Sequence, residues 1–106
     1  MANNYKNSKV DLTSTSITTL YTSPASTTAI MKSILVSDDS GSGDTITLTI
    51  TSGSDVFSIY KEKAVGANGT VALLTAPLVV QASEILKVTA ATANRLHVVA
   101  SYLEIT

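Results

Sequence analysis

Apolar and polar residues alternate most clearly in the middle of the chain. Ile46, Leu48 and Ile50 alternate with threonines at 45, 47, 49 and 51. A period of two places the aliphatic side chains on one face of a strand and the threonines on the other. A Ser-Gly-Ser-Asp turn and a β-branched and aromatic run, Val56–Tyr60, follow directly. Two such runs joined by a short glycine-containing loop predict a β-hairpin.

Similar short apolar runs, separated by Gly, Pro, Asn and Ser, occur on both sides of this hairpin. No segment keeps a helical period over three turns. Strands at spacings of about 8–12 residues with turn residues between them are typical of antiparallel sandwiches. The sequence therefore predicts an all-β fold, a single antiparallel β-sandwich or jelly roll of about eight strands. The further strands are expected at Val10–Leu12, Ile17–Tyr21, Thr28–Ser37, Thr70–Thr75, Leu78–Val80, Glu84–Ala90 and Arg95–Ile105.

The domain organisation follows from the polar start of the chain. Residues 1–8 carry little apolar content and are predicted to form an extended N-terminal arm, with the sandwich spanning residues 9–106. Polar N-terminal segments fray unless another group holds them. We therefore expect the arm to lie on a neighbouring subunit.

Two strands carry apolar residues on both parities. In 28–37, Ile30, Ile34 and Val36 share one parity, while Met31 and Leu35 share the other. The strand 95–105 has the same property. One face of each strand suffices for the core of a small sandwich, and soluble monomers rarely expose large apolar patches. The excess predicts self-association around a closed symmetry axis. The predicted interface residues, arm included, are Ala2, Asn3, Asn4, Tyr5, Met31, Leu35, Val99, Leu103 and Ile105.

Composition narrows the possible partners. Charged residues make up 14% of the 106 residues, against roughly 25% in typical soluble domains. The net charge is −1 and no basic patch stands out, so no nucleic-acid partner is expected. The start of the chain lacks the apolar core of a secretion signal, and no run reaches the length of a membrane helix. We expect a soluble protein that is made without Sec-type export and has no membrane partner.

Candidate chemistry is sparse. His97 is the single histidine, and no recognisable motif supplies the partners of a triad or a zinc site. The loop with Asp38, Asp39 and Asp44 has oxygen ligands suited to Ca²⁺, although its spacing is not that of an EF-hand. A solvated loop whose carboxylates cap turns is the favoured alternative. The glutamates at 62, 84 and 104 are too far apart in sequence to show a glycosidase pair. No catalytic, cofactor or metal residue is predicted.

Three segments resemble a group of small tailed-bacteriophage virion proteins. They are LYTSPASTTAIMKSILVSDDSG at 20–41, LLTAPLVVQASEILKV at 73–88 and VVASYLEIT at 98–106. The resemblance covers about residues 17–106, and its motifs are turns and strand residues. Ala82-Ser83-Glu84 stands where that group usually has Ala-Gly-Asp, and Asp38 where it often has Asn.

This resemblance implies a non-enzymatic structural component of a phage particle. We expect a capsid decoration, or cement, protein that binds the major capsid protein through its arm and sheet faces, as a homo-oligomer with a trimer favoured. A place in the neck or tail is an alternative within the virion. A carbohydrate-binding attachment module is an alternative of another class, although the single Phe and the absence of Trp leave no aromatic platform for sugars.

Overall fold

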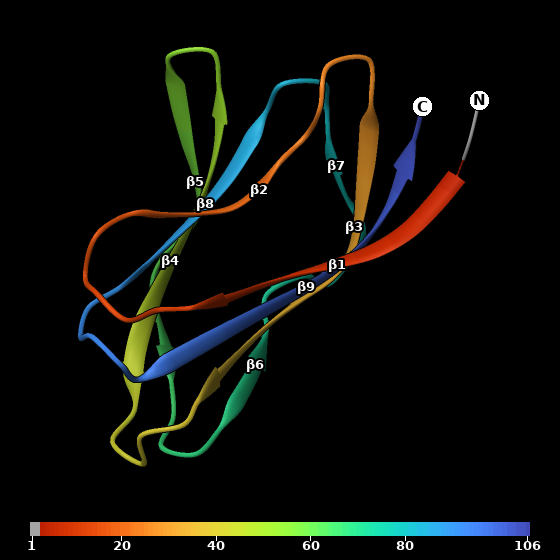
Figure 1. Cartoon of the computed structure of the whole chain (residues 1–106). Coiled ribbons are helices and arrows are strands. Elements are labelled where there is room, and N and C mark those ends of the chain that lie inside the picture. The colour runs from red at the N-terminus through yellow and green to blue at the C-terminus, as the bar shows by residue number, and fades with distance from the viewer. Residues whose placement is uncertain (1–2) are drawn as a thin grey trace.

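The computed structural model describes residues 3–106, which form a two-layer β-sandwich (Figure 1). The prediction of an all-β sandwich is confirmed. Nine strands lie in the described part of the chain: β1 (Asn3–Asp11), β2 (Thr18–Thr22), β3 (Thr28–Asp38), β4 (Asp44–Ser52), β5 (Asp55–Val65), β6 (Thr70–Ala72), β7 (Leu78–Val80), β8 (Ile85–Ala90) and β9 (Leu96–Ile105).

The strands form two antiparallel sheets. The five-stranded sheet has the order β1-β9-β3-β6, and β7 also pairs with β3. The four-stranded sheet has the order β2-β8-β4-β5. Apart from the β4–β5 hairpin and the β6–β7 link, every connection crosses from one sheet to the other. This is the connectivity of a jelly roll, in which β6 and β7 together occupy one strand position.

The predicted hairpin is β4 and β5. Ser52 pairs with Asp55, so Gly53 and Ser54 form a two-residue loop, with Gly53 at a φ of 62°. Left-handed backbone of this kind is easily adopted by glycine and suits tight hairpin turns. Ile46 and Leu48 are fully buried, the threonines at 45, 47 and 49 are half-buried, and Thr51 is buried.

The N-terminal arm is corrected by the structure. Residues 3–8, expected to reach a neighbour, belong to β1 and pair with β9 in unbroken register from Asn3↔Ile105 to Asp11↔His97. The predicted boundary between an arm and a sandwich beginning at residue 9 therefore does not exist within the described residues. The edge strand expected at Val10–Leu12 is the end of this longer strand. These polar residues form a strand because their backbone N–H and C=O groups pair with those at the edge of β9.

The predicted parity of β3 is also wrong, and a β-bulge is the reason. Met31 pairs with Tyr102 and Ser33 pairs with Ser101, so Lys32 is an extra residue without a partner on β9. The bulge shifts the alternation by one position. As a result Met31 and Ile34 both point into the core, each 0% exposed, while Leu35 is turned outward.

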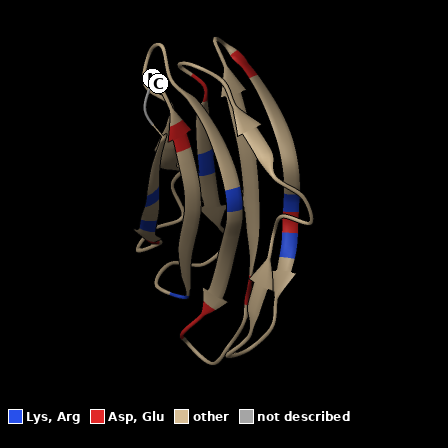
Figure 2. Cartoon of the chain, turned by 90° about the vertical axis from the view of Figure 1, so that its right-hand side faces the viewer, with Lys and Arg blue, Asp and Glu red and all other residues tan. Residues whose placement is uncertain are grey.

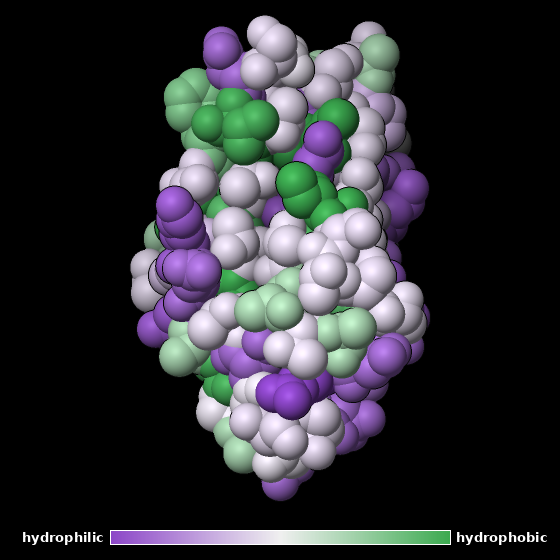
Figure 3. All heavy atoms as spheres, turned by 90° about the vertical axis from the view of Figure 1, so that its left-hand side faces the viewer, coloured by the Kyte–Doolittle hydropathy of each residue, from purple (hydrophilic) through white to green (hydrophobic). Residues whose placement is uncertain are grey.

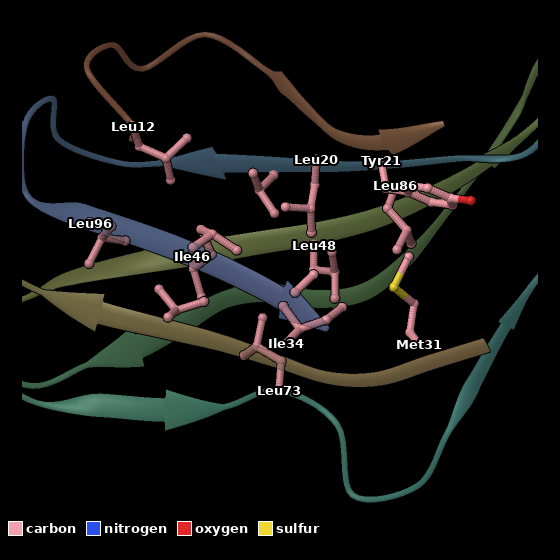
Figure 4. Close-up of a cluster of buried hydrophobic side chains, with 14 of the residues drawn as sticks. Leu12, Leu20, Tyr21, Met31, Ile34, Ile46, Leu48, Leu73, Leu86 and Leu96 are labelled. Carbon is pink, nitrogen blue, oxygen red and sulfur yellow. The ribbon is translucent and has the colours of Figure 1, made fainter. Parts of the chain in front are cut away.

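A second bulge explains two consecutive buried residues in β2. Thr19 pairs with Lys87 and Tyr21 with Leu86, so Leu20 is the extra residue, and both Leu20 and Tyr21 are buried. These side chains meet those of the opposite sheet in one hydrophobic core (Figure 4). Besides Leu20 and Tyr21, the labelled side chains in that view are Leu12, Met31, Ile34, Ile46, Leu48, Leu73, Leu86 and Leu96.

Candidate interaction surface

The outer face of the five-stranded sheet carries rows of side chains that run across its strands, and three central rows lie between a row that contains Ile105 and a row that contains His97. The register fixes each row, because residues paired on neighbouring strands share a face. The upper row is Tyr5, Leu103, Ile30 and Val79; the middle row is Asn7, Ser101 and Ser33; and the lower row is Lys9, Val99, Leu35 and Ala72.

The upper and lower rows expose apolar surface. Tyr5 is 77% exposed, Val79 50%, Leu35 41% and Val99 37%. These four residues come from four different strands, so the apolar surface is spread across the sheet rather than confined to one element. Figure 2 views the chain from this side, and Lys, Arg, Asp and Glu colour only short pieces of the strands.

The outer face of the four-stranded sheet differs in chemistry. The outward positions of its central strands are the threonines at 45, 47, 49 and 51 on β4, with Ile85, Lys87 and Thr89 on β8. In Figure 3, which views this side, pale side chains of intermediate hydropathy cover most of the surface. Exposed large apolar residues of this sheet are Val56 and Phe57, both next to the hairpin loop. The two sheets therefore differ in how their exposed apolar side chains are distributed: on the five-stranded sheet they come from four strands, and on the four-stranded sheet they lie beside the hairpin loop.

Two shallow recesses lie along β1 and β9. One, of about 300 Å³, is lined by Tyr5, Lys6, Asn7, Lys32, Ser101 and Tyr102. The other, of about 320 Å³, is lined by Lys9, Val10, Asp11, His97, Val98 and Val99. The lining of the first includes Asn7 and Ser101 of the middle row.

Most of the predicted interface residues are on this face. Asn3, Tyr5, Leu35, Val99, Leu103 and Ile105 share it. Asn4 pairs with Glu104 and has the opposite, inward parity, although it is exposed. Met31 is wrongly assigned to the second face, since the bulge at Lys32 places it in the core. Ala2 lies outside the described residues.

Sequence reasoning did not select Ile30 and Val79 for this surface. The same bulge is responsible for Ile30, because it separates Ile30 from the parity of Ile34. Val79 belongs to the short run Leu78-Val79-Val80, whose alternation is too brief to show which residue points outward. Pairing of Val79 with Ile30 decides the matter in the structure.

A buried polar group lies where β1, β2 and β9 meet. Glu104 is 6% exposed and accepts a 2.6 Å hydrogen bond from the Tyr21 hydroxyl. It also forms an ion pair with Lys6 Nζ at 2.9 Å. The Lys6 contact, followed by the Tyr21 hydrogen bond, lowers the pKa of Glu104. Burial, then the hydrogen bond to Glu104, raises the pKa of Tyr21. A phenol held protonated in this way is a structural donor and a poor nucleophile.

The acidic loop predicted as a possible calcium site has another use. Asp38 Oδ1 accepts hydrogen bonds from the backbone and hydroxyl of Ser40, and Oδ2 accepts from the backbone N–H groups of Gly43 and Asn68. The Ser40 hydroxyl is the largest cause of a strongly lowered pKa at Asp38. Both oxygens are engaged, so ligation of a cation would break these bonds. The carboxylate caps two loops, as the favoured sequence interpretation expects.

The other acidic residue of this loop with a described partner is Asp44. Its Oδ2 accepts a 2.8 Å bond from Thr92 N–H, and Arg95 Nη1 donates to the carbonyl of Gly43 at 2.9 Å. Three loops therefore meet at this end of the sandwich. Among residues 3–106 no group of three or more His, Cys, Asp and Glu side chains is arranged to hold a metal ion.

His97 lies on the outer face, 3.2 Å from Asp11 across the β1–β9 pair, and both side chains are substantially exposed. Glu84 accepts a 2.7 Å bond from the backbone of Gln81 within its own turn. Glu104 is occupied by Tyr21 and Lys6. These groups are engaged in separate local contacts rather than gathered in one pocket. Within the described chain, no helix has the length and apolarity to cross a membrane.

Comparison with known proteins supports the fold. No protein-family model matches the sequence, and no curated protein matches it. Among solved structures, the chain is similar to one chain of the "Acidic stable capsid structure of Helicobacter pylori bacteriophage KHP30". The match has a TM-score of 0.59 at 6% identity and covers 100% of this chain and 94% of that one. The chain is thus a jelly-roll β-sandwich. A chain in a phage capsid structure has a similar fold over nearly its whole length.

Proposed function

We propose that this protein is a non-enzymatic structural subunit of a tailed-phage virion, and that it decorates the capsid by binding shell subunits. The observation that carries the proposal is the inequality of the two outer faces. Tyr5, Leu35, Val79 and Val99 spread exposed apolar surface over four strands of one sheet face, as is typical of an interface, whereas Val56 and Phe57 of the other sheet are confined to the end beside its hairpin loop.

The fold comparison and the sequence resemblance support the same role. The similar solved chain belongs to a phage capsid structure, and the resembling sequences belong to virion proteins. The low charge content, 14%, suits a surface that packs against other subunits, since long charged side chains are depleted in interface cores.

The edge strand β1 offers a second mode of contact. It stands at one end of the five-stranded sheet and has only β9 as a neighbour. Its free backbone groups can accept an extended segment of a shell subunit by β-augmentation. In this proposal the edge strand β1 takes the role that the sequence analysis gave to a separate N-terminal arm.

Quantifying the protein in purified particles tests this function. A copy number close to that of the major shell protein is expected for capsid decoration. A much smaller number, confined to one vertex, would place it in the neck or tail, and its absence from particles would refute a virion role. Specific binding to a glycan array, with no incorporation into particles, would instead favour an attachment module.

A variant comparison links the role to the apolar face. Val79→Asp puts a charge in the upper row, and Ser58→Asp puts the same charge on β5 of the other sheet. We expect the first variant to lose incorporation into particles and the second to keep it. Equal incorporation of both would remove the apolar face from the function.

A further inference from the structure

The three central rows of the outer face have an internal symmetry. The upper and lower rows are both apolar on β9 and β3, through Leu103 and Ile30 above and Val99 and Leu35 below. The middle row between them consists of short polar side chains, Asn7, Ser101 and Ser33. A two-fold rotation about a line along the middle row would exchange the upper and lower rows.

We propose that the partner of this face is a second copy of the same chain, placed face to face about a two-fold axis along the middle row. The proposal deepens the function proposed above: it rests on that face being an interface, it assigns the face to pairing of two copies, and it leaves the edge strand β1 to contact the shell subunits. The rotation brings Leu103 of one copy opposite Val99 of the other, and Ile30 opposite Leu35. The middle row then faces itself, with Ser101 opposite Ser101.

The edge residues also fit this arrangement. Tyr5, the most exposed apolar residue of the face, comes opposite Lys9 of the second copy. An aromatic ring packs well against an aliphatic lysine stem, and the ammonium group gains from the ring face. Closed two-fold pairing of one patch with itself is the commonest symmetry of soluble oligomers.

The size of the patch predicts a reversible dimer. Four strands about 4.8 Å apart and nine residues at about 3.4 Å give a flat footprint on the order of 500 Å² before side-chain relief is counted. Stable interfaces bury about 800 Å² per partner, so this one is at the small end. The lysines at position 32, exposed beside the middle row, bring like charges near the axis. Association should therefore strengthen with added salt, which screens them.

Sedimentation of the purified full chain tests the stoichiometry. We expect the mass to rise with concentration from that of one chain, 11.0 kDa, to twice that value and no further. Leu35→Glu, in the lower row, should remain at the mass of one chain, while Thr49→Glu on the outer face of β4 should dimerise like the parent. A parent monomer at every concentration, or a trimer as the end state, overturns the proposal.

Cross-linking tests the position of the axis. The sequence contains no cysteine, so each introduced cysteine is the single thiol of its variant. Facing sheets lie about 10 Å apart, too far for a direct disulfide, so a short bismaleimide is the reagent. Ser101→Cys, on the axis, should cross-link to itself. Val99→Cys should react with Leu103→Cys in a mixture but far less with itself, because two Val99 positions are about 14 Å apart along the strands.

Thr49→Cys, on the four-stranded sheet, serves as the control and should stay uncross-linked. Circular dichroism of each variant shows that the sandwich is retained. Failure of Ser101→Cys to cross-link, or equal reaction of Val99→Cys with itself, overturns the two-fold arrangement. These measurements use isolated protein, so they can refute the two-fold dimer while incorporation into particles still supports the virion role. Loss of incorporation can likewise refute the virion role while the dimer is still observed.

Discussion

The bulge at Lys32 leads to a prediction for the stability of alanine variants at two adjacent residues, Ile34 and Leu35. Ile34 is 0% exposed and Leu35 is 41% exposed, and replacement of either by alanine removes three carbon atoms. At about 0.8 kcal/mol per buried carbon, full burial of three carbons is worth about 2.4 kcal/mol. Leu35→Ala, scaled by the buried fraction, should cost about 1.4 kcal/mol, with solvent filling the space. Ile34→Ala leaves an internal cavity as well, and should cost about 3–4 kcal/mol.

Urea denaturation of both variants, at concentrations low enough to keep the chain monomeric, measures these free energies of unfolding. The expected difference of about 2 kcal/mol is a large share of the 5–15 kcal/mol typical of a domain. In a strand without the bulge, Leu35 would share the core face with Met31, and Ile34 would be outside. Equal costs, or a larger cost for Leu35→Ala, would therefore refute the shift in alternation.

Three further outcomes are expected. Tyr21→Phe removes the hydrogen bond to buried Glu104 and should cost about 1–3 kcal/mol by urea denaturation, while Tyr5→Phe, on the exposed face, should be neutral. Asp38 has a lowered pKa in the folded state, so it stabilises the fold above its unfolded pKa of about 4, and this stabilisation is lost as the pH falls through the lower folded value. Asp38→Asn should therefore be less stable than the parent at pH 7 by urea denaturation and should lose less stability than the parent on acidification. Deleting Lys32 restores continuous alternation in β3 and should leave the far-UV spectrum folded, whereas deleting Thr47 from β4 turns the rest of that strand over and should unfold the chain.

The sequence alone determined the fold class and the faces of the regular strands. In β4 and β8 the alternation is unbroken, so local pattern and burial agree for Ile46, Leu48, Leu86 and Val88. In β9 the same rule correctly placed Val99 and Leu103 outside. These strands could be read because the side-chain period of two is a property of extended backbone and needs no knowledge of the partner.

Tertiary structure decided what depends on pairing between distant segments. The bulge that puts Met31 in the core exists only in register with β9, some 70 residues on, and no local pattern marks it. The leading polar residues become β1 because β9 has an open edge to offer. Asp38 and Glu104 acquired their roles from donors that the fold brings beside them, Asn68 and Tyr21, and burial then fixed those contacts.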